Sequence, residues 1–130
     1  MADTALSPLV VDWTHEPEPA AAGQIRRAVR ALLAARGVAR ERADDALTVV
    51  EELVVNVLDH ARTRFRLVVR LRGGVLHLAV RDQAGAVPDL RPLDPRAARG
   101  RGLQLVAGLA DRWGCEPHPD GKTVWAELRV

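Results

Sequence analysis

The sequence predicts an α/β fold of the α+β kind: a two-layer sandwich in which helices cover one face of a mixed sheet. Two stretches of helical periodicity occupy residues 20–61, and alternating strands with a Gly-Gly turn follow them. The glycine fingerprint of a dinucleotide-binding unit is missing after the first expected strand, which disfavours that fold. With 130 residues, 48% of them hydrophobic, the chain is expected to form one domain spanning residues 1–130.

A short strand and an amphipathic helix are expected first. Residues 6–14 are apolar and rich in valine, and two prolines follow, which is typical of a strand and its end. From Ala20 to Arg36, apolar side chains recur at helical spacing: Ile25, Ala28, Val29, Leu32 and Leu33. Gly37 stands where the C-terminus of a helix favours glycine. The pattern therefore predicts a helix that ends near Arg36.

The second predicted helix has the clearest pattern in the sequence. Its apolar residues recur after three or four positions: Ala46, Val49, Val50, Leu53, Val54, Val57, Leu58 and Ala61. The opposite face is acidic, with Asp44, Asp45, Glu51, Glu52 and Asp59. The spacing predicts a helix that is buried along one side over its whole length.

A change to period two then predicts a β-hairpin. The apolar residues Phe65, Leu67, Val69 and Leu71 stand at every second position, and most of the residues between them are arginines. Gly73-Gly74 is a tight-turn signal, and Val75 to Asp82 is the returning strand.

The segment from Gln83 to Arg99 has three prolines and no sustained period. A loop of this length is either a functional lid or plain disorder. Beyond it, a helix is expected from Gly100 to Gly114, because apolar residues recur at Leu103, Val106, Ala107, Leu109 and Ala110. A turn at 119–121 then leads into a last alternating strand over residues 123–130.

Composition excludes several classes of function. The single cysteine, Cys115, cannot form an internal disulfide, and the four histidines lack the spacing of a zinc site. A net charge of +2, from 19 basic and 17 acidic residues, and few aromatic residues argue against direct nucleic-acid binding. No apolar run is long enough for a membrane helix, and the start does not resemble a signal peptide. A cytoplasmic location without a membrane partner is expected.

Glu52 and Asn56 are the first candidate functional pair. They lie four residues apart on the second helix, so their side chains are neighbours at the flank of the buried stripe. An amide oxygen can bind a hard cation, and an adjacent carboxylate can orient or deprotonate a hydroxyl group. On these two residues alone, an ordinary solvated helix face is the simpler explanation of the pattern.

Two further features interrupt the structural pattern. Asp82 falls on the same inward face as Leu76, Leu78 and Val80, so it either binds a donor such as a purine amino group or starts the turn before Gly85. Gly100-Arg101-Gly102 stands at a loop-to-helix junction, where free backbone N–H groups suit phosphate and Arg101 can add a charge-assisted contact. Ordinary loop geometry is the other explanation for these glycines.

Taken in chain order, four segments resemble the N, G1, G2 and G3 boxes of the GHKL ATPase superfamily. They are Glu52 to Ala61, Asp82-Gln-Ala-Gly85, Gly100-Arg-Gly102-Leu103 and Gly121-Lys-Thr-Val-Trp125, and Leu-Ala-Asp-Arg-Trp-Gly at 109–114 is a further likeness. The resemblance covers about residues 9–130. More narrowly, the chain looks like the small actinobacterial histidine-kinase-like ATP-binding proteins related to anti-sigma factor serine/threonine kinases.

The resemblance implies a Bergerat-type sandwich that binds ATP and Mg²⁺, with residues 86–99 as the ATP lid. Asn56 resembles the magnesium ligand, Glu52 the catalytic general base and Asp82 the adenine-binding aspartate. The other residues implied to contact the nucleotide are Gly85 of the G1 box, Gly100, Arg101, Gly102 and Leu103 of the G2 box, and Thr123 of the G3 box near the base.

Two functions follow from the resemblance. One is an anti-sigma-type serine/threonine kinase that phosphorylates a STAS-domain anti-anti-sigma protein and thereby controls a sigma factor. The other is a non-catalytic, ATP-gated or nucleotide-free protein-binding module. The superfamily's Asp-x-Gly-x-Gly is reduced here to Asp82-Gln-Ala-Gly85-Ala, which favours the module, whereas Glu52 and Asn56 favour the kinase. Whether a homodimer forms is left open.

Overall fold

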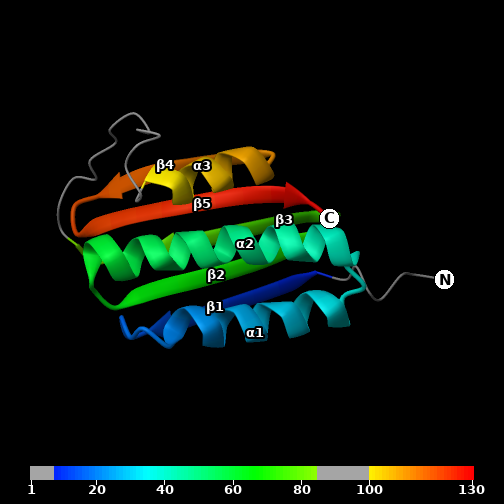
Figure 1. The fold of residues 1–130 in the computed structure, drawn as a ribbon, viewed down its shortest axis with the longest axis horizontal. Coiled ribbons are helices and arrows are strands. Elements are labelled where there is room, and N and C mark those ends of the chain that lie inside the picture. Colours follow the sequence, from blue (N-terminus) through cyan, green and yellow to red (C-terminus); the bar gives the residue numbers. More distant parts are fainter. Residues whose placement is uncertain (1–7, 85–99) are drawn as a thin grey trace.

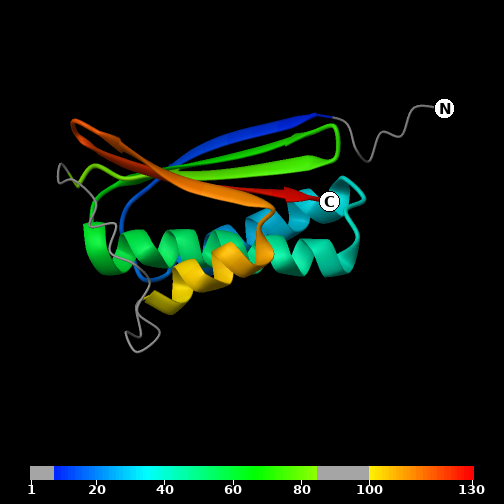
Figure 2. The ribbon, with the colours of Figure 1, turned by 90° about the horizontal axis from the view of Figure 1, so that it is seen from above.

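The computed structural model describes residues 8–84 and 100–130, and at residues 100–102 the backbone only. The elements follow the chain as β1 (Leu9–His15), α1 (Ala21–Ala35), α2 (Arg40–Asn56), the π-helical turn η2 (Val57–Ala61), β2 (Phe65–Arg72), β3 (Val75–Arg81), α3 (Gly100–Leu109), β4 (Arg112–His118) and β5 (Gly121–Arg129). The three α-helices lie on one face of the sheet, and α2 lies between α1 and α3 (Figures 1 and 2). The predicted two-layer sandwich with helices on one face is confirmed.

The sheet has the strand order β1-β2-β3-β5-β4, and all four described pairings are antiparallel. The expectation of a mixed sheet is thus corrected. Tight turns join β2 to β3 and β4 to β5, which makes both pairs antiparallel. Between β1 and β2, two successive helices reverse the chain, whereas a single crossover helix would have brought β2 back parallel to β1.

The core lies between the sheet and the helices and follows the predicted periodicities. The alternating residues of β2 are buried, and so is the apolar stripe of α2 as far as Val57. The hairpin turn is confirmed, since Gly73 and Gly74 have φ values of +58° and +75° and both central residues of such a turn need positive φ. None of the described helices is long and apolar enough to cross a membrane.

One predicted element is wrong in its extent. The third helix ends at Leu109 and not at Gly114, because Arg112–His118 forms the edge strand β4. Gly114 pairs with Trp125 of β5, and a Cβ atom at Gly114 would lie 2.9 Å from the Trp125 ring. The glycine therefore makes room for an indole on the neighbouring strand and does not end a helix.

Candidate functional site

The four motif segments meet at one end of the sandwich. The end of α2 with η2, the end of β3, the start of α3 and the start of β5 all lie at the left-hand end of the molecule as drawn (Figures 1 and 2). These segments are far apart in the sequence, and the antiparallel course of the chain brings their ends together. Gly85 and the predicted lid, residues 86–99, lie outside the described residues.

Glu52 and Asn56 are half-buried on the last turns of α2. Asn56 is the last residue of the α-helix, and the wider π-helical turn begins directly after it, with the Arg62 N–H donating to the Val57 carbonyl oxygen at 2.8 Å. Single π-helical turns within helices are frequent at functional sites. The local backbone is thus irregular directly after Asn56, the amide that the resemblance implies as a magnesium ligand.

The two adjacent glutamates have different surroundings. Glu51 Oε2 accepts a hydrogen bond from Arg26 Nη1 of α1 at 2.8 Å. Glu52 has no ion pair or hydrogen bond within the described ranges, and its pKa is raised, first by burial and then by the negative charges of Glu51 and Asp59. A carboxylate in this position is stabilised by a proton or by a nearby cation. The raised pKa of Glu52 and its lack of a partner among the described residues are both consistent with a general base beside a bound metal.

The raised pKa of Glu52 gives a pH-dependent prediction for Glu52→Gln. Because the folded pKa lies above the usual value of 4.5, the charged carboxylate destabilises the folded state once the pH exceeds the folded pKa. Glutamine imitates the neutral form, so the variant should be more stable than wild type at about pH 7. The difference should shrink as the pH falls through the folded pKa towards 4.5, as measured by urea unfolding across this range. A wild type that is the more stable of the two at neutral pH would contradict it.

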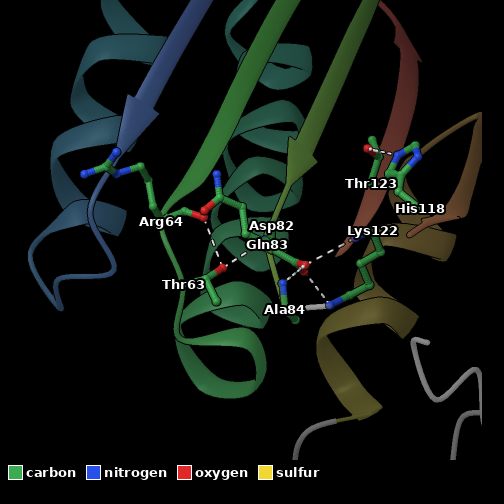
Figure 3. Close-up of polar contacts among 8 residues, drawn as sticks. All are labelled: Thr63, Arg64, Asp82, Gln83, Ala84, His118, Lys122 and Thr123. Atoms are coloured by element: carbon green, nitrogen blue, oxygen red, sulfur yellow. Dashed lines mark hydrogen bonds and ion pairs between the residues drawn. The ribbon is translucent and has the colours of Figure 1, made fainter. Parts of the chain in front are cut away.

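Asp82 follows β3 directly, and its side chain is only 1% exposed, as its predicted inward position requires. Its Oδ1 accepts from the Ala84 N–H at 3.1 Å and from the Lys122 N–H at 3.3 Å. Its Oδ2 accepts from Lys122 Nζ at 2.5 Å (Figure 3). The Ala84 contact is that of a turn-forming aspartate, but the ammonium of Lys122 is its strongest partner.

Lys122 is the residue that the sequence analysis missed. It is the only lysine among 19 basic side chains, and its side chain is 12% exposed. It precedes the inward residues Val124, Ala126 and Leu128 at period two, so strand parity alone places it on the same face as Asp82. The alternation of inward and outward residues in β5 was thus the sequence signal that could have placed Lys122 near Asp82.

Thr123 is not brought to Asp82. Its side chain belongs to the outer face of the sheet, where Thr123 Oγ1 and His118 Nε2 share a hydrogen bond of 2.8 Å (Figure 3). There it lines a shallow hollow of about 260 Å³ with His77, Trp125 and neighbouring charged residues. In this register the side chains of Thr123 and Asp82 therefore lie on opposite faces of the sheet.

The remaining candidates belong to the start of α3. Gly100 is the first residue of this helix, with Arg101 and Gly102 in its first turn. The free N–H groups of that turn face the chain's N-terminal direction, as in every α-helix. Leu103 is half-buried and packs against the core, so its side chain anchors the helix.

Comparisons with known proteins agree with this arrangement. A family model described as the histidine kinase-like ATPase domain matches residues 15–128. The RsbU and RsbW domains of Rv1364c from Mycobacterium tuberculosis match with a TM-score of 0.74 and 20% identity, over 93% of this chain and 32% of that one. The histidine kinase domain of a blue-light activated histidine kinase from Erythrobacter litoralis matches with a TM-score of 0.57 and 20% identity, over 84% of this chain and 59% of that one.

The chain thus spans about a third of the first of these structures and 59% of the second. At 20% identity, both similarities concern the fold. A search among curated proteins gives no match. Because the family model extends over nearly the whole chain, and its motifs meet at one end of the fold, the protein belongs to the histidine kinase-like ATPase domain family.

Proposed function

We propose that this chain is an ATP-binding regulator of the anti-sigma type, with serine/threonine kinase activity towards a STAS-domain anti-anti-sigma protein. The observation that supports it is the meeting of the four motif segments at one end of the sandwich. ATP binding, usually with Mg²⁺, is the property of the family. The partner class comes from the motif resemblance, and the similarity to a structure with an RsbW domain supports the fold that this function needs.

The described residues fit Mg²⁺ only in company with phosphate. No group of three histidine, cysteine, aspartate or glutamate residues within 8–84 and 103–130 could hold a metal ion. Mg²⁺ commonly takes one or two protein ligands and completes its shell with water and substrate phosphates. The Asn56 side-chain oxygen would supply the protein ligand, next to the negative charge of Glu52. The ion would neutralise charge on the phosphates during transfer.

The other motif residues would divide the remaining work. Glu52 would orient the acceptor hydroxyl of the partner and take its proton. The backbone N–H groups of Gly100 and Gly102 would bind phosphate at the start of α3, with Arg101 adding a charged contact. Asp82 would accept a hydrogen bond from the amino group of adenine. In such a transfer, positioning and charge neutralisation supply most of the rate.

The non-catalytic module is the second candidate, and one observation favours it. The carboxylate of Asp82, which would recognise adenine, is buried and forms an ion pair with the Lys122 ammonium. While Lys122 is paired with Asp82, the chain would bind its protein partner mostly without bound nucleotide. ATP would act only by changing the affinity for that partner. The reduced glycine motif after Asp82 agrees with this alternative.

ATP binding is tested by thermal unfolding in the presence of ATP and Mg²⁺. A ligand at 100 times its dissociation constant stabilises a fold by about 2.7 kcal/mol when it binds only the native state. The unfolding temperature should therefore rise with ATP and rise less with ATP plus a chelator of Mg²⁺. A protein that shows no shift with ATP on the order of millimolar would contradict the kinase and the ATP-gated module, and would leave only a nucleotide-free module.

Phosphotransfer separates the two candidates. The protein is incubated with γ-labelled ATP and a STAS-domain protein encoded near its own gene. Label on a serine or threonine of that protein supports the kinase. ATP-dependent binding of that protein without transfer of label supports the module.

A further inference from the structure

We propose that Lys122 is a built-in competitor for the purine amino group, so that adenine reaches Asp82 only after the Lys122 ammonium has moved away. This inference rests on the proposed function, because it concerns the same base-recognition carboxylate. It assigns a specificity-determining role to a residue outside the predicted site. Its consequence is a weak apparent ATP affinity that the chain itself sets.

The geometry leaves no free surface on the carboxylate. Asp82 Oδ1 already accepts from two backbone N–H groups, and Oδ2 accepts from Lys122 Nζ at 2.5 Å. The Asp82 side chain is 1% exposed and Lys122 Nζ occupies Oδ2, so a ligand that is to bond to Oδ2 in place of Lys122 has to displace this ammonium. In Figure 3 the Lys122 side chain runs alongside Asp82, and its ammonium lies at the carboxylate.

The chemistry of the two donors favours the lysine. A hydrogen bond between an ammonium and a carboxylate joins two opposite charges, whereas the amino group of adenine is a neutral donor. Removal of one member of a buried ion pair leaves the other charge uncompensated. Adenine must therefore displace a stronger donor. The observed dissociation constant is then the intrinsic one divided by the fraction of molecules in which Lys122 has moved away.

The strand pairing does not depend on the ammonium. Asp82 N–H donates to the Lys122 carbonyl oxygen at 3.0 Å, and the Lys122 N–H reaches Oδ1. Both contacts use the backbone of residue 122. A variant with another long side chain at this position therefore keeps the contacts that hold the end of β3 to the start of β5.

The sign of the effect makes Lys122→Met a sharp test. ATP is an anion, so removal of a nearby cation should by electrostatics alone weaken its binding. If Lys122 blocks the base site, Lys122→Met should instead tighten ATP binding by about tenfold, because one hydrogen bond to a charged group becomes available to adenine. Methionine keeps the unbranched apolar stem of lysine.

Two control variants distinguish a blocked adenine site from a general effect of positive charge on ATP binding and from a loss of folding. Lys122→Arg keeps a cation beside Asp82 and should leave ATP affinity close to that of wild type. Arg81→Met removes a cation from the neighbouring position of β3, whose side chain pairs with Asp120 and not with Asp82. It should weaken ATP binding slightly or leave it unchanged. Circular dichroism and unfolding of each variant without nucleotide establish that it is folded.

The experiment measures the dissociation constants of ATP and of GTP with Mg²⁺ by isothermal titration for wild type and the three variants. Tighter ATP binding by Lys122→Met alone, without a similar gain for GTP, supports the inference. An unchanged or weaker ATP affinity of folded Lys122→Met, beside measurable binding by wild type, overturns the inference and leaves the proposed function intact. If neither wild type nor Lys122→Met binds ATP, the proposed function fails and the inference fails with it.

The single lysine gives a second readout in the nucleotide-free protein. An amine-specific acetylating reagent can modify only Lys122 and the N-terminal amine, and mass spectrometry separates the two sites. Asp82→Asn should speed acetylation of Lys122 several-fold relative to the N-terminal amine, because the ion pair is lost. An equal rate in both proteins would show that the pair does not hold the ammonium in solution, which would overturn the inference.

Discussion

Replacement of Glu52 by alanine should lower phosphotransfer to the STAS-domain partner by about 10²–10⁴-fold, the contribution typical of general-base assistance. ATP binding should be retained, because Asn56, Asp82 and the start of α3 are untouched. Helix geometry selects this residue. At about 100° per residue, Glu52 and Asn56 project some 40° apart, whereas Glu51 and Asn56 project some 140° apart.

Glu51→Ala is the matched control for this prediction. Glu51 is engaged with Arg26 in an ion pair whose side chains are 37% and 45% exposed, and pairs of this kind contribute little to stability. This variant should retain both phosphotransfer and ATP binding. The measurement is label transfer from γ-labelled ATP, with isothermal titration of ATP on both variants. Normal transfer by Glu52→Ala would remove its assignment as the base.

Gly121→Ala should destabilise the fold by about 3 kcal/mol or more, at the upper end of the range for overpacking. A Cβ atom at Gly121 would lie 2.1 Å from the backbone oxygen of Asp82, and this backbone cannot move aside as a side chain could. Gly121 also has φ near +155°, where residues other than glycine are strained. The loss is measured as the change in the free energy of unfolding in urea.

Gly108→Ala is the control for Gly121→Ala. It tests whether the loss of stability at Gly121 comes from the close contact with Asp82 and from the backbone conformation of Gly121. Gly108 lies within α3, and a Cβ atom there would have no heavy atom within 4 Å. Alanine is favoured over glycine inside a helix by about 0.5–1 kcal/mol, so this variant should be slightly more stable than wild type. If both variants lost stability equally, the close approach of Gly121 to Asp82 would not be the cause.

Local patterns predicted most of the secondary structure because they record which side of an element is buried. The stripe of α2, the alternation of β2 and the Gly73-Gly74 turn each depend on neighbours within a few residues. The inward position of Asp82 followed from the same parity as Leu78 and Val80. The edge strand β4 was missed because it lacks a buried alternating face. Its residue Gly114 is required by close contact with the Trp125 ring on the neighbouring strand, which no local pattern indicates.

The sequence by itself determined the order of the motifs, the family that they resemble and the neighbouring positions of Glu52 and Asn56 on one helix. Only the tertiary structure decided which groups meet across the sheet. Asp82 and Lys122 are 40 residues apart, and Glu51 and Arg26 are 25 apart. Contacts over such separations depend on strand register and helix packing, which leave no local periodic signal. For that reason the contact between the Lys122 ammonium and the Asp82 carboxylate became visible only in the folded chain.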